Sequence, residues 1–215
     1  VSMEQARVWY GRAAEQGHIT AQFNLALMHH QGQGGPMSME QARVWFGRAA
    51  EQGDAQAQCN LGAMHHKGRG GPVSMEQARV WYRRAADQGH AKAQYNLANM
   101  HYHGRGGRVS MEQARVWFGR AAEQGYAPAQ NNLAGMHYNG ECGPLSMEHA
   151  NFWSKRAAAQ GINAMQMMVQ DLKSTCFSCG KRRASGELNM KKLRCSGCKC
   201  AIYCSEVCQR AHWKK

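Results

Sequence analysis

Seven of the nine cysteines of the chain lie in one stretch near its C-terminus. Six of them form three close pairs: Cys176 with Cys179, Cys195 with Cys198, and Cys204 with Cys208. Zinc is bound by four thiolate or imidazole ligands in a tetrahedron, and a short gap between two cysteines lets both reach one ion. The spacing therefore predicts zinc binding, and we prefer this interpretation to a disulfide framework.

The stretch CSEVCQRAHW adds a histidine to the candidate ligands. If it is a helix, Cys204, Cys208 and His212 follow one another at four-residue steps and share one face. Residues 174–215 contain little apolar side chain to form a core. We therefore expect the free energy of metal binding to supply the folding free energy of this segment.

The motifs CFSCG, RCSGC, IYC and HW occur in this order and resemble a MYND-type zinc finger. The resemblance implies two zinc ions in a cross-braced module, with Cys176, Cys179, Cys204 and Cys208 at the first site. Cys195 and Cys198 would begin the second site. The last two ligands of the family would follow Lys215, so we expect a truncated chain with one complete site. The alternative is a second site completed by the substitute ligands Cys200 and His212.

MYND fingers also imply a partner, a short proline-containing peptide laid beside a small strand pair. Gln209 and Trp213 occupy the positions expected to contact it. A tryptophan beside a zinc-fixed helix would offer a rigid apolar surface to such a peptide. A tryptophan that only closes the small core of the module is the alternative.

Two other functions remain open for this segment. A RING-like module would make the chain a ubiquitin-ligase component, but the Cys-x-His-x2-Cys centre of a RING is missing. A nucleic-acid-associated regulator is the other, because the net charge is +13 and residues 176–215 contain ten Lys or Arg and two Glu. The candidate contacts are Lys181, Arg182, Arg183, Lys191, Lys192 and Arg194. We favour it less, because no helix is left free to enter a groove.

The rest of the chain is organised by a repeat of 36 residues. The segment SMEQARVWYGRAAEQG begins at Ser2 and returns almost unchanged at Ser38, Ser74 and Ser110, and in altered form at Ser146. Repetition at this period indicates supersecondary units that bury their apolar faces only against neighbouring units.

Each unit is predicted to contain two helices. Ser2 and Gln5 form a capping-box pattern, so the first helix should begin near Met3 and end before Gly17. Its apolar stripe consists of Ala6, Trp9, Tyr10, Ala13 and Ala14. A second helix of about three turns carries Ala21, Leu25 and Met28 and should end at Gly32. We expect the alanines to allow close helix contacts and the tryptophan to fill the space between repeats.

AEQG, AQxNL and the glycine-rich loop resemble Sel1-like repeats, which are related to tetratricopeptide repeats. We therefore predict an all-α fold, an α-solenoid of helix-turn-helix repeats over residues 1–173, followed by a small cross-braced zinc-binding module over 174–215. The predicted units are 1–36, 37–72, 73–108 and 109–144, with a degenerate capping unit at 145–173. Because the chain starts inside a repeat, we expect it to be truncated at its N-terminus as well.

Histidine and arginine each recur at one position of the repeat, and we call each such set of equivalent residues a column. His29, His65, His101 and His137 stand where the family usually has tyrosine, and successive repeats lie too far apart for one ion to bridge them. We expect ring packing, with some favourable positive charge near the helix C-terminus. Glu4 and Arg7 are expected to lie on solvated surfaces.

We find no catalytic constellation in the repeats, so the predicted function is a non-enzymatic adaptor: the solenoid binds one protein and the zinc finger another. Cys59 and Cys142 are predicted to be a buried apolar residue and a loop thiol. Their isolation indicates an intracellular reducing compartment, cytoplasm or nucleus. No apolar run reaches the ~20 residues of a membrane-spanning helix, so we expect no membrane partner.

Overall fold

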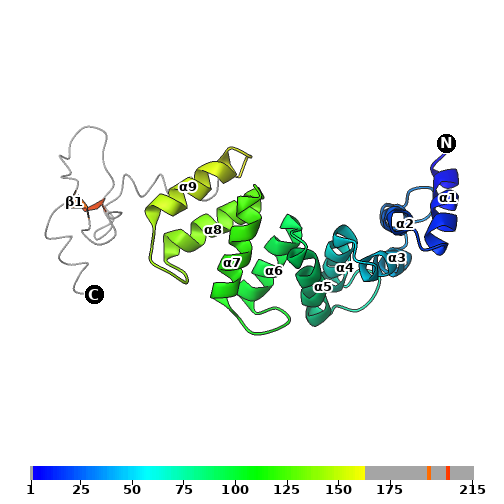
Figure 1. The fold of residues 1–215 in the computed structure, drawn as a ribbon, viewed down its shortest axis with the longest axis horizontal. Coiled ribbons are helices and arrows are strands. Elements are labelled where there is room, and N and C mark those ends of the chain that lie inside the picture. Colours follow the sequence, from blue (N-terminus) through cyan, green and yellow to red (C-terminus); the bar gives the residue numbers. More distant parts are fainter. Residues whose placement is uncertain (1, 163–192, 195–201, 204–215) are drawn as a thin grey trace. The chain divides into compact units, whose positions relative to one another are not determined.

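The computed structural model describes residues 2–162 and two short strands at 193–194 and 202–203. The described residues form nine helices and one antiparallel strand pair (Figure 1). The helices are α1 (Met3–Glu15), α2 (Ile19–Gln31), α3 (Met39–Glu51), α4 (Ala55–Lys67), α5 (Met75–Asp87), α6 (Ala91–His103), α7 (Met111–Glu123), α8 (Ala127–Asn139) and α9 (Met147–Ala158). The strands are β1 (Leu193–Arg194) and β2 (Ile202–Tyr203). The predicted all-α solenoid is confirmed over the repeats.

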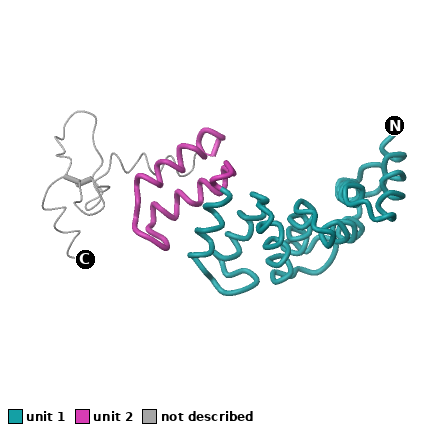
Figure 2. Tube along the Cα trace, viewed as in Figure 1, with its two compact units in different colours: residues 1–121 teal, residues 122–215 magenta. Residues whose placement is uncertain are grey.

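The chain divides into two compact units, Val1–Ala121 and Ala122–Lys215, and α7 contributes residues to both (Figure 2). Within unit 1, each helix from α1 to α5 packs against the next one in the sequence. Within unit 2, α8 packs against α9. The second helix predicted for the fifth repeat falls outside the described residues.

Serine begins the odd-numbered helices, as predicted. The hydroxyl of Ser2 accepts a hydrogen bond from the backbone N–H of Gln5, and the Gln5 side chain accepts one from the Ser2 N–H, which completes a capping box. In the next repeat the hydroxyl of Ser38 still caps α3, but its N–H donates to the carbonyl of His29 at 2.9 Å. The full capping box is therefore seen at α1, whereas the later serine caps that the structure describes also join one repeat to the next.

Glycine ends the even-numbered helices and shapes the loop that follows. Gly32 caps α2 in the left-handed conformation, φ 69°, which costs glycine no steric strain. Two residues later, Gly34 passes so close to the Met3 carbonyl group that a Cβ atom would collide with it. Gly70 and Gly106 repeat this approach to Met39 and Met75. Each glycine-rich loop therefore crosses the start of the odd-numbered helix in its own repeat.

The core of unit 1 is built mainly from alanine with a few large side chains. Ala42, Ala49 and Ala57 are completely buried, which permits the close helix approach that the sequence predicts. Trp45 and Phe46 of α3 belong to one buried cluster with Leu25 of α2 and Leu61 of α4. The predicted role of the tryptophan is confirmed at Trp45, 9% exposed, but not at the equivalent Trp9, which is 62% exposed. No helix precedes α1 in the described chain to cover it.

The two isolated cysteines form no disulfide with a described residue and lie as predicted: Cys59 is buried and Cys142 is exposed in a loop. Burial raises the pKa of Cys59 to about 11, so this thiol stays protonated and packs as a small apolar side chain. Among the described residues, no helix has the length and apolarity needed to cross a membrane.

Candidate functional site

The predicted zinc ligands lie outside the described residues. These are Cys176, Cys179, Cys195, Cys198, Cys204 and Cys208, the substitutes Cys200 and His212, and the predicted peptide contacts Gln209 and Trp213. Strands β1 and β2 are described, and they pair antiparallel with Leu193 opposite Tyr203 and Arg194 opposite Ile202. In the sequence, Cys195 directly follows β1 and Cys204 directly follows β2.

The donor set of this segment fits zinc. Six paired thiols match the sulfur ligands of structural zinc sites, which are closed and tetrahedral. Cysteine thiols must lose their protons to bind the ion as thiolates, and a preformed site rarely exists in the unfolded chain, so metal binding and folding of such a module are coupled. A short antiparallel pair next to the cysteines agrees with the small strand pair that the sequence resemblance implies.

In the repeats, the histidine column pairs with the arginine column of the preceding helix. The Nη2 atom of Arg7 lies 2.8 Å from Nδ1 of His29, and Arg43 and His65 show the same distance. Arg7 also donates from Nη1 to the carbonyl oxygen of Pro36 at 3.3 Å. Each of these arginines therefore joins an odd helix, an even helix and the glycine-rich loop of one repeat.

Burial and this contact together favour the neutral form of the histidines. A guanidinium can only donate, so Nδ1 of His29 must accept and its remaining proton sits on Nε2. Burial and the neighbouring Arg7 both lower the pKa of His29, and burial and Arg43 do the same for His65. Burial lowers the pKa of His101 to about 4, with further contributions from Arg79 and Arg83. These rings are neutral near pH 7, so the expected favourable charge at the helix C-terminus is wrong.

The arginine column was also predicted incorrectly as a solvated surface. Glu4 is exposed as expected, but Arg7, Arg43 and Arg79 are half-buried and hydrogen-bonded. The signal was present in the sequence, because arginine and histidine both recur with the same 36-residue period at a separation of 22 residues.

A second set of contacts links neighbouring repeats. Nη1 of Arg69, in the loop after α4, lies 3.4 Å from Nε2 of His30 in α2. Arg105, after α6, approaches His66 of α4 at the same distance. The thiol of Cys59 in α4 also shares a hydrogen bond with Asn96 in α6. These contacts join the even-numbered helices of neighbouring repeats in unit 1.

A glutamine ladder holds the interior of the repeats. Gln22, Gln58 and Gln130 are buried, and each donates from Nε2 to an alanine carbonyl eight residues earlier, at 3.0 to 3.1 Å. Their side-chain oxygens accept from Gln52, Gln88 and Gln160, each 30 residues later, at 2.7 to 3.1 Å. These bonds satisfy polar groups that would otherwise be costly to bury.

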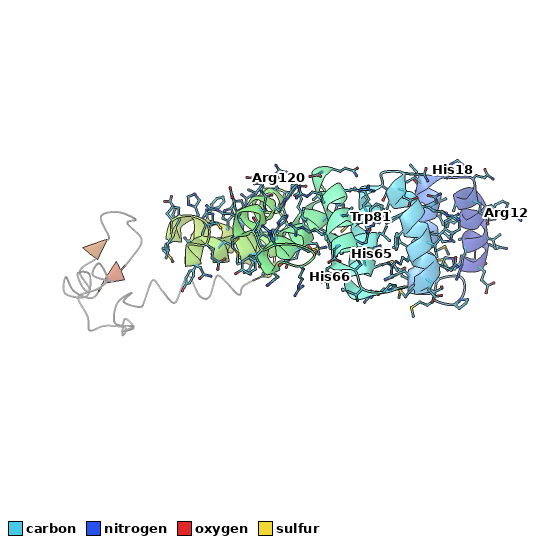
Figure 3. All side chains as sticks on the ribbon, turned by 90° about the horizontal axis from the view of Figure 1, so that it is seen from below. Arg12, His18, His65, His66, Trp81 and Arg120 are labelled. Carbon is cyan, nitrogen blue, oxygen red and sulfur yellow. The ribbon has the colours of Figure 1, made fainter. Side chains whose placement is uncertain are left out.

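The odd-numbered helices carry an arginine stacked on each tryptophan. The Cζ atom of Arg48 lies 4.4 Å from the ring centroid of Trp45, and that of Arg84 lies 4.6 Å from Trp81. Figure 3 shows His18 and Arg120 near one edge of the helices of unit 1 and His66 near the opposite edge. A guanidinium over an aromatic ring is a favourable cation–π contact, so each pair adds to the stability of its helix.

The acidic residues of unit 1 are concentrated on the odd-numbered helices. Seven of the eight Asp and Glu residues of this unit lie on odd-numbered helices, and the eighth, Asp54, caps α4. Helices α2, α4 and α6 contain none. We call the side of α2, α4 and α6 that carries Asn24, Asn60, Asn96, Lys67 and Lys92 the even-helix face. Arg69 and Arg105 lie at its edge.

Family comparisons agree with this architecture. The Sel1 repeat model matches residues 1–18, 19–54, 55–90, 91–126 and 127–162, and so runs from the even helix of one period to the odd helix of the next. The MYND finger model matches residues 176–215. Both are protein-interaction modules, and the MYND finger implies zinc binding. No curated protein gave a significant match to the chain.

Two solved structures show the same fold. A Sel1 repeat protein from Oxalobacter formigenes is 32% identical with a TM-score of 0.72, over 80% of this chain and 68% of that protein. A protective antigen present in uropathogenic Escherichia coli strains, which displays an SLR fold, is 33% identical with a TM-score of 0.78. That match covers 85% of this chain and 39% of the antigen.

Proposed function

We propose, because this chain belongs to the Sel1 repeat family and carries a MYND finger, that it is a non-enzymatic adaptor. The repeat array binds one protein, and the zinc finger binds a second through a proline-containing segment. The observation that carries the proposal is the periodic outward surface of the repeats, on which the same side chains recur in successive helix pairs. Stacked repeats of this kind use such extended surfaces to bind other proteins.

We propose the proline-containing peptide as the ligand of the zinc finger because the sequence motifs of this segment resemble those of MYND fingers. Cys176, Cys179, Cys204 and Cys208 would hold one ion, and Cys195 and Cys198 would contribute to a second. Gln209 and Trp213 would contact the proline-containing segment next to β1 and β2. The free thiols Cys59 and Cys142 support a reducing intracellular compartment as the site of action.

Zinc content and peptide binding test the proposal together. Native mass spectrometry of the full chain should show bound zinc, and fluorescence anisotropy should detect binding to members of a set of labelled proline-containing decapeptides. Trp213→Ala should weaken that binding at least about tenfold, because buried aromatic anchors carry much of the affinity of such contacts. Trp9→Ala, the same substitution in the repeats, should leave it unchanged.

Two kinds of result would count against this function. Peptide binding that survives Trp213→Ala, or that survives zinc removal, would remove the finger from the binding site. Discharge of ubiquitin from a charged conjugating enzyme would favour the ligase alternative instead. Two zinc ions in this chain would leave the adaptor function standing and would make Cys200 and His212 ligands of the second site.

A further inference from the structure

The even-helix face combines a repeated amide side chain with an excess of basic residues, and the packing of the helices explains neither feature. Amide side chains recur at the same position of α2, α4 and α6, as Asn24, Asn60 and Asn96, and all three are half-buried. Its charged residues are all basic, whereas the acidic residues of unit 1 lie almost entirely on the odd-numbered helices.

The asparagine side chains retain hydrogen-bonding capacity. Asn24 and Asn60 are half-buried, and within the described chain neither side chain makes a hydrogen bond. Asn96 shares one with the Cys59 thiol. A primary amide offers two N–H donors and one oxygen acceptor, which is the complement of a peptide main chain. Amides repeated once per helix pair can therefore hold the backbone of an extended segment.

The cations around this column also lack carboxylate partners. No acidic group of the described residues lies within ion-pair distance of Lys67, Lys92, Arg69 or Arg105. Arg69 and Arg105 contact only the rings of His30 and His66, and both lysines are exposed. Burial, followed by Arg105 and Lys67, lowers the pKa of His66, so burial and the neighbouring cations both favour its neutral form.

We propose that the even-helix face binds an extended acidic peptide segment. The amides of Asn24, Asn60 and Asn96 hydrogen-bond its main chain, and Lys67, Lys92, Arg69 and Arg105 pair with its carboxylates. The inference rests on the proposed function and names the chemistry of the partner of the repeat array. Four cations spread over two repeats suit a few carboxylates better than the dense phosphate charge of nucleic acid.

Charge reversal on the full chain tests the inference. The probe is a fluorescein-labelled twelve-residue peptide of alternating Glu and Ala, compared by anisotropy with the Lys-Ala peptide and a twelve-nucleotide oligo-dT strand. The double variant Lys67→Glu/Lys92→Glu should lose at least about tenfold in affinity for the Glu-Ala peptide. Its control, Arg48→Glu/Arg84→Glu on the odd-numbered helices, makes the same change in net charge and should stay within about twofold of the wild-type affinity.

A second variant tests the amides separately from charge. Asn24→Ala/Asn60→Ala should weaken binding of the Glu-Ala peptide while the thermal midpoint stays close to that of the wild-type chain, since these side chains make no described hydrogen bond. Equal loss in the Arg48→Glu/Arg84→Glu control, unchanged binding in the lysine variant, or tighter binding of oligo-dT would each overturn the inference. The proline-containing peptides, measured on the same variants, report whether the adaptor function itself still holds.

Discussion

The Nη2 atom of Arg79 in α5 lies 3.0 Å from Nδ1 of His101 in α6. The backbone carbonyl of the same histidine accepts a hydrogen bond from the N–H of Ser110, which precedes α7, at 2.9 Å. His101 is only 3% exposed. One buried residue thus connects two helices of a repeat to the start of the next helix, and Arg43 with His65 and Ser74 repeats the arrangement.

We predict that the free energy of unfolding decreases as the pH is lowered from 6.5 to about 4. The pKa of His101 is lowered from 6.5 to about 4 in the folded chain, so in this range the unfolded chain binds a proton that the folded chain does not. This proton changes the free energy of unfolding by up to about 1.4 kcal/mol per pH unit. The pKa values of His29, His65 and His66 are shifted in the same direction.

Urea unfolding followed by circular dichroism at several pH values measures this slope. His101→Phe removes the titrating ring and should flatten the dependence below pH 6.5. An equal slope in the variant and the wild-type chain would show that His101 is protonated to the same extent in both states.

Tryptophans at equivalent repeat positions should differ sharply in their contribution to stability. Trp45 is 9% exposed, so Trp45→Ala leaves a cavity and should cost about 3–5 kcal/mol. Trp9 is 62% exposed, so Trp9→Ala should change stability by about 0.5 kcal/mol or less. Chemical unfolding of both variants provides the comparison, and similar losses would contradict the burial of Trp45.

The glutamine ladder is predicted to stabilise the repeats through its buried bonds. Gln58→Ala leaves the Ala50 carbonyl and the Gln88 side chain without their partner and should cost about 1–3 kcal/mol. Gln56 lies on the same helix but is exposed, and Gln56→Ala should be almost neutral. The two variants have the same composition, so a difference in their urea midpoints reports the ladder directly.

Loop and helix glycines should respond in opposite directions to alanine. Gly70 has φ 69°, and a Cβ atom there would collide with the Met39 carbonyl, so Gly70→Ala should lower the melting temperature. Gly47 lies inside α3 with no atom within 4 Å of its would-be Cβ, and Gly47→Ala should stabilise by about 0.5–1 kcal/mol. Scanning calorimetry resolves the two directions, and stabilisation by Gly70→Ala would disprove the close loop crossing.

The sequence was sufficient to predict where the helices of the repeat begin and end, because capping and helix-ending residues act on neighbouring residues. The serine cap at Ser2 and the glycine at Gly32 set the ends of α1 and α2, and the period of 36 residues placed the same elements in each copy. The small alanines and Trp45 were correctly assigned to helix contacts, since an apolar stripe identifies the buried side of a helix.

Long-range polar contacts were not predicted. Arginine is usually solvated, so periodicity alone did not indicate that Arg7 crosses to His29 on another helix. The neutral state of His101 depends on burial and on Arg79 and Arg83, which only the packed structure brings together. The absence of acidic residues from α2, α4 and α6 was readable in the sequence, but its meaning required knowing that these helices share one surface.

The central claim is that the repeats and the zinc finger bind different partners independently. Its most direct test measures both labelled probes, the Glu-Ala peptide and a proline-containing decapeptide selected with the full chain, before and after zinc removal by a chelator. We predict that the chelated chain loses its affinity for the proline-containing peptide and keeps its affinity for the Glu-Ala peptide within about twofold. The reason is that we expect the repeats, unlike the zinc finger, to fold without metal. Loss of both probes, or of neither, would contradict it.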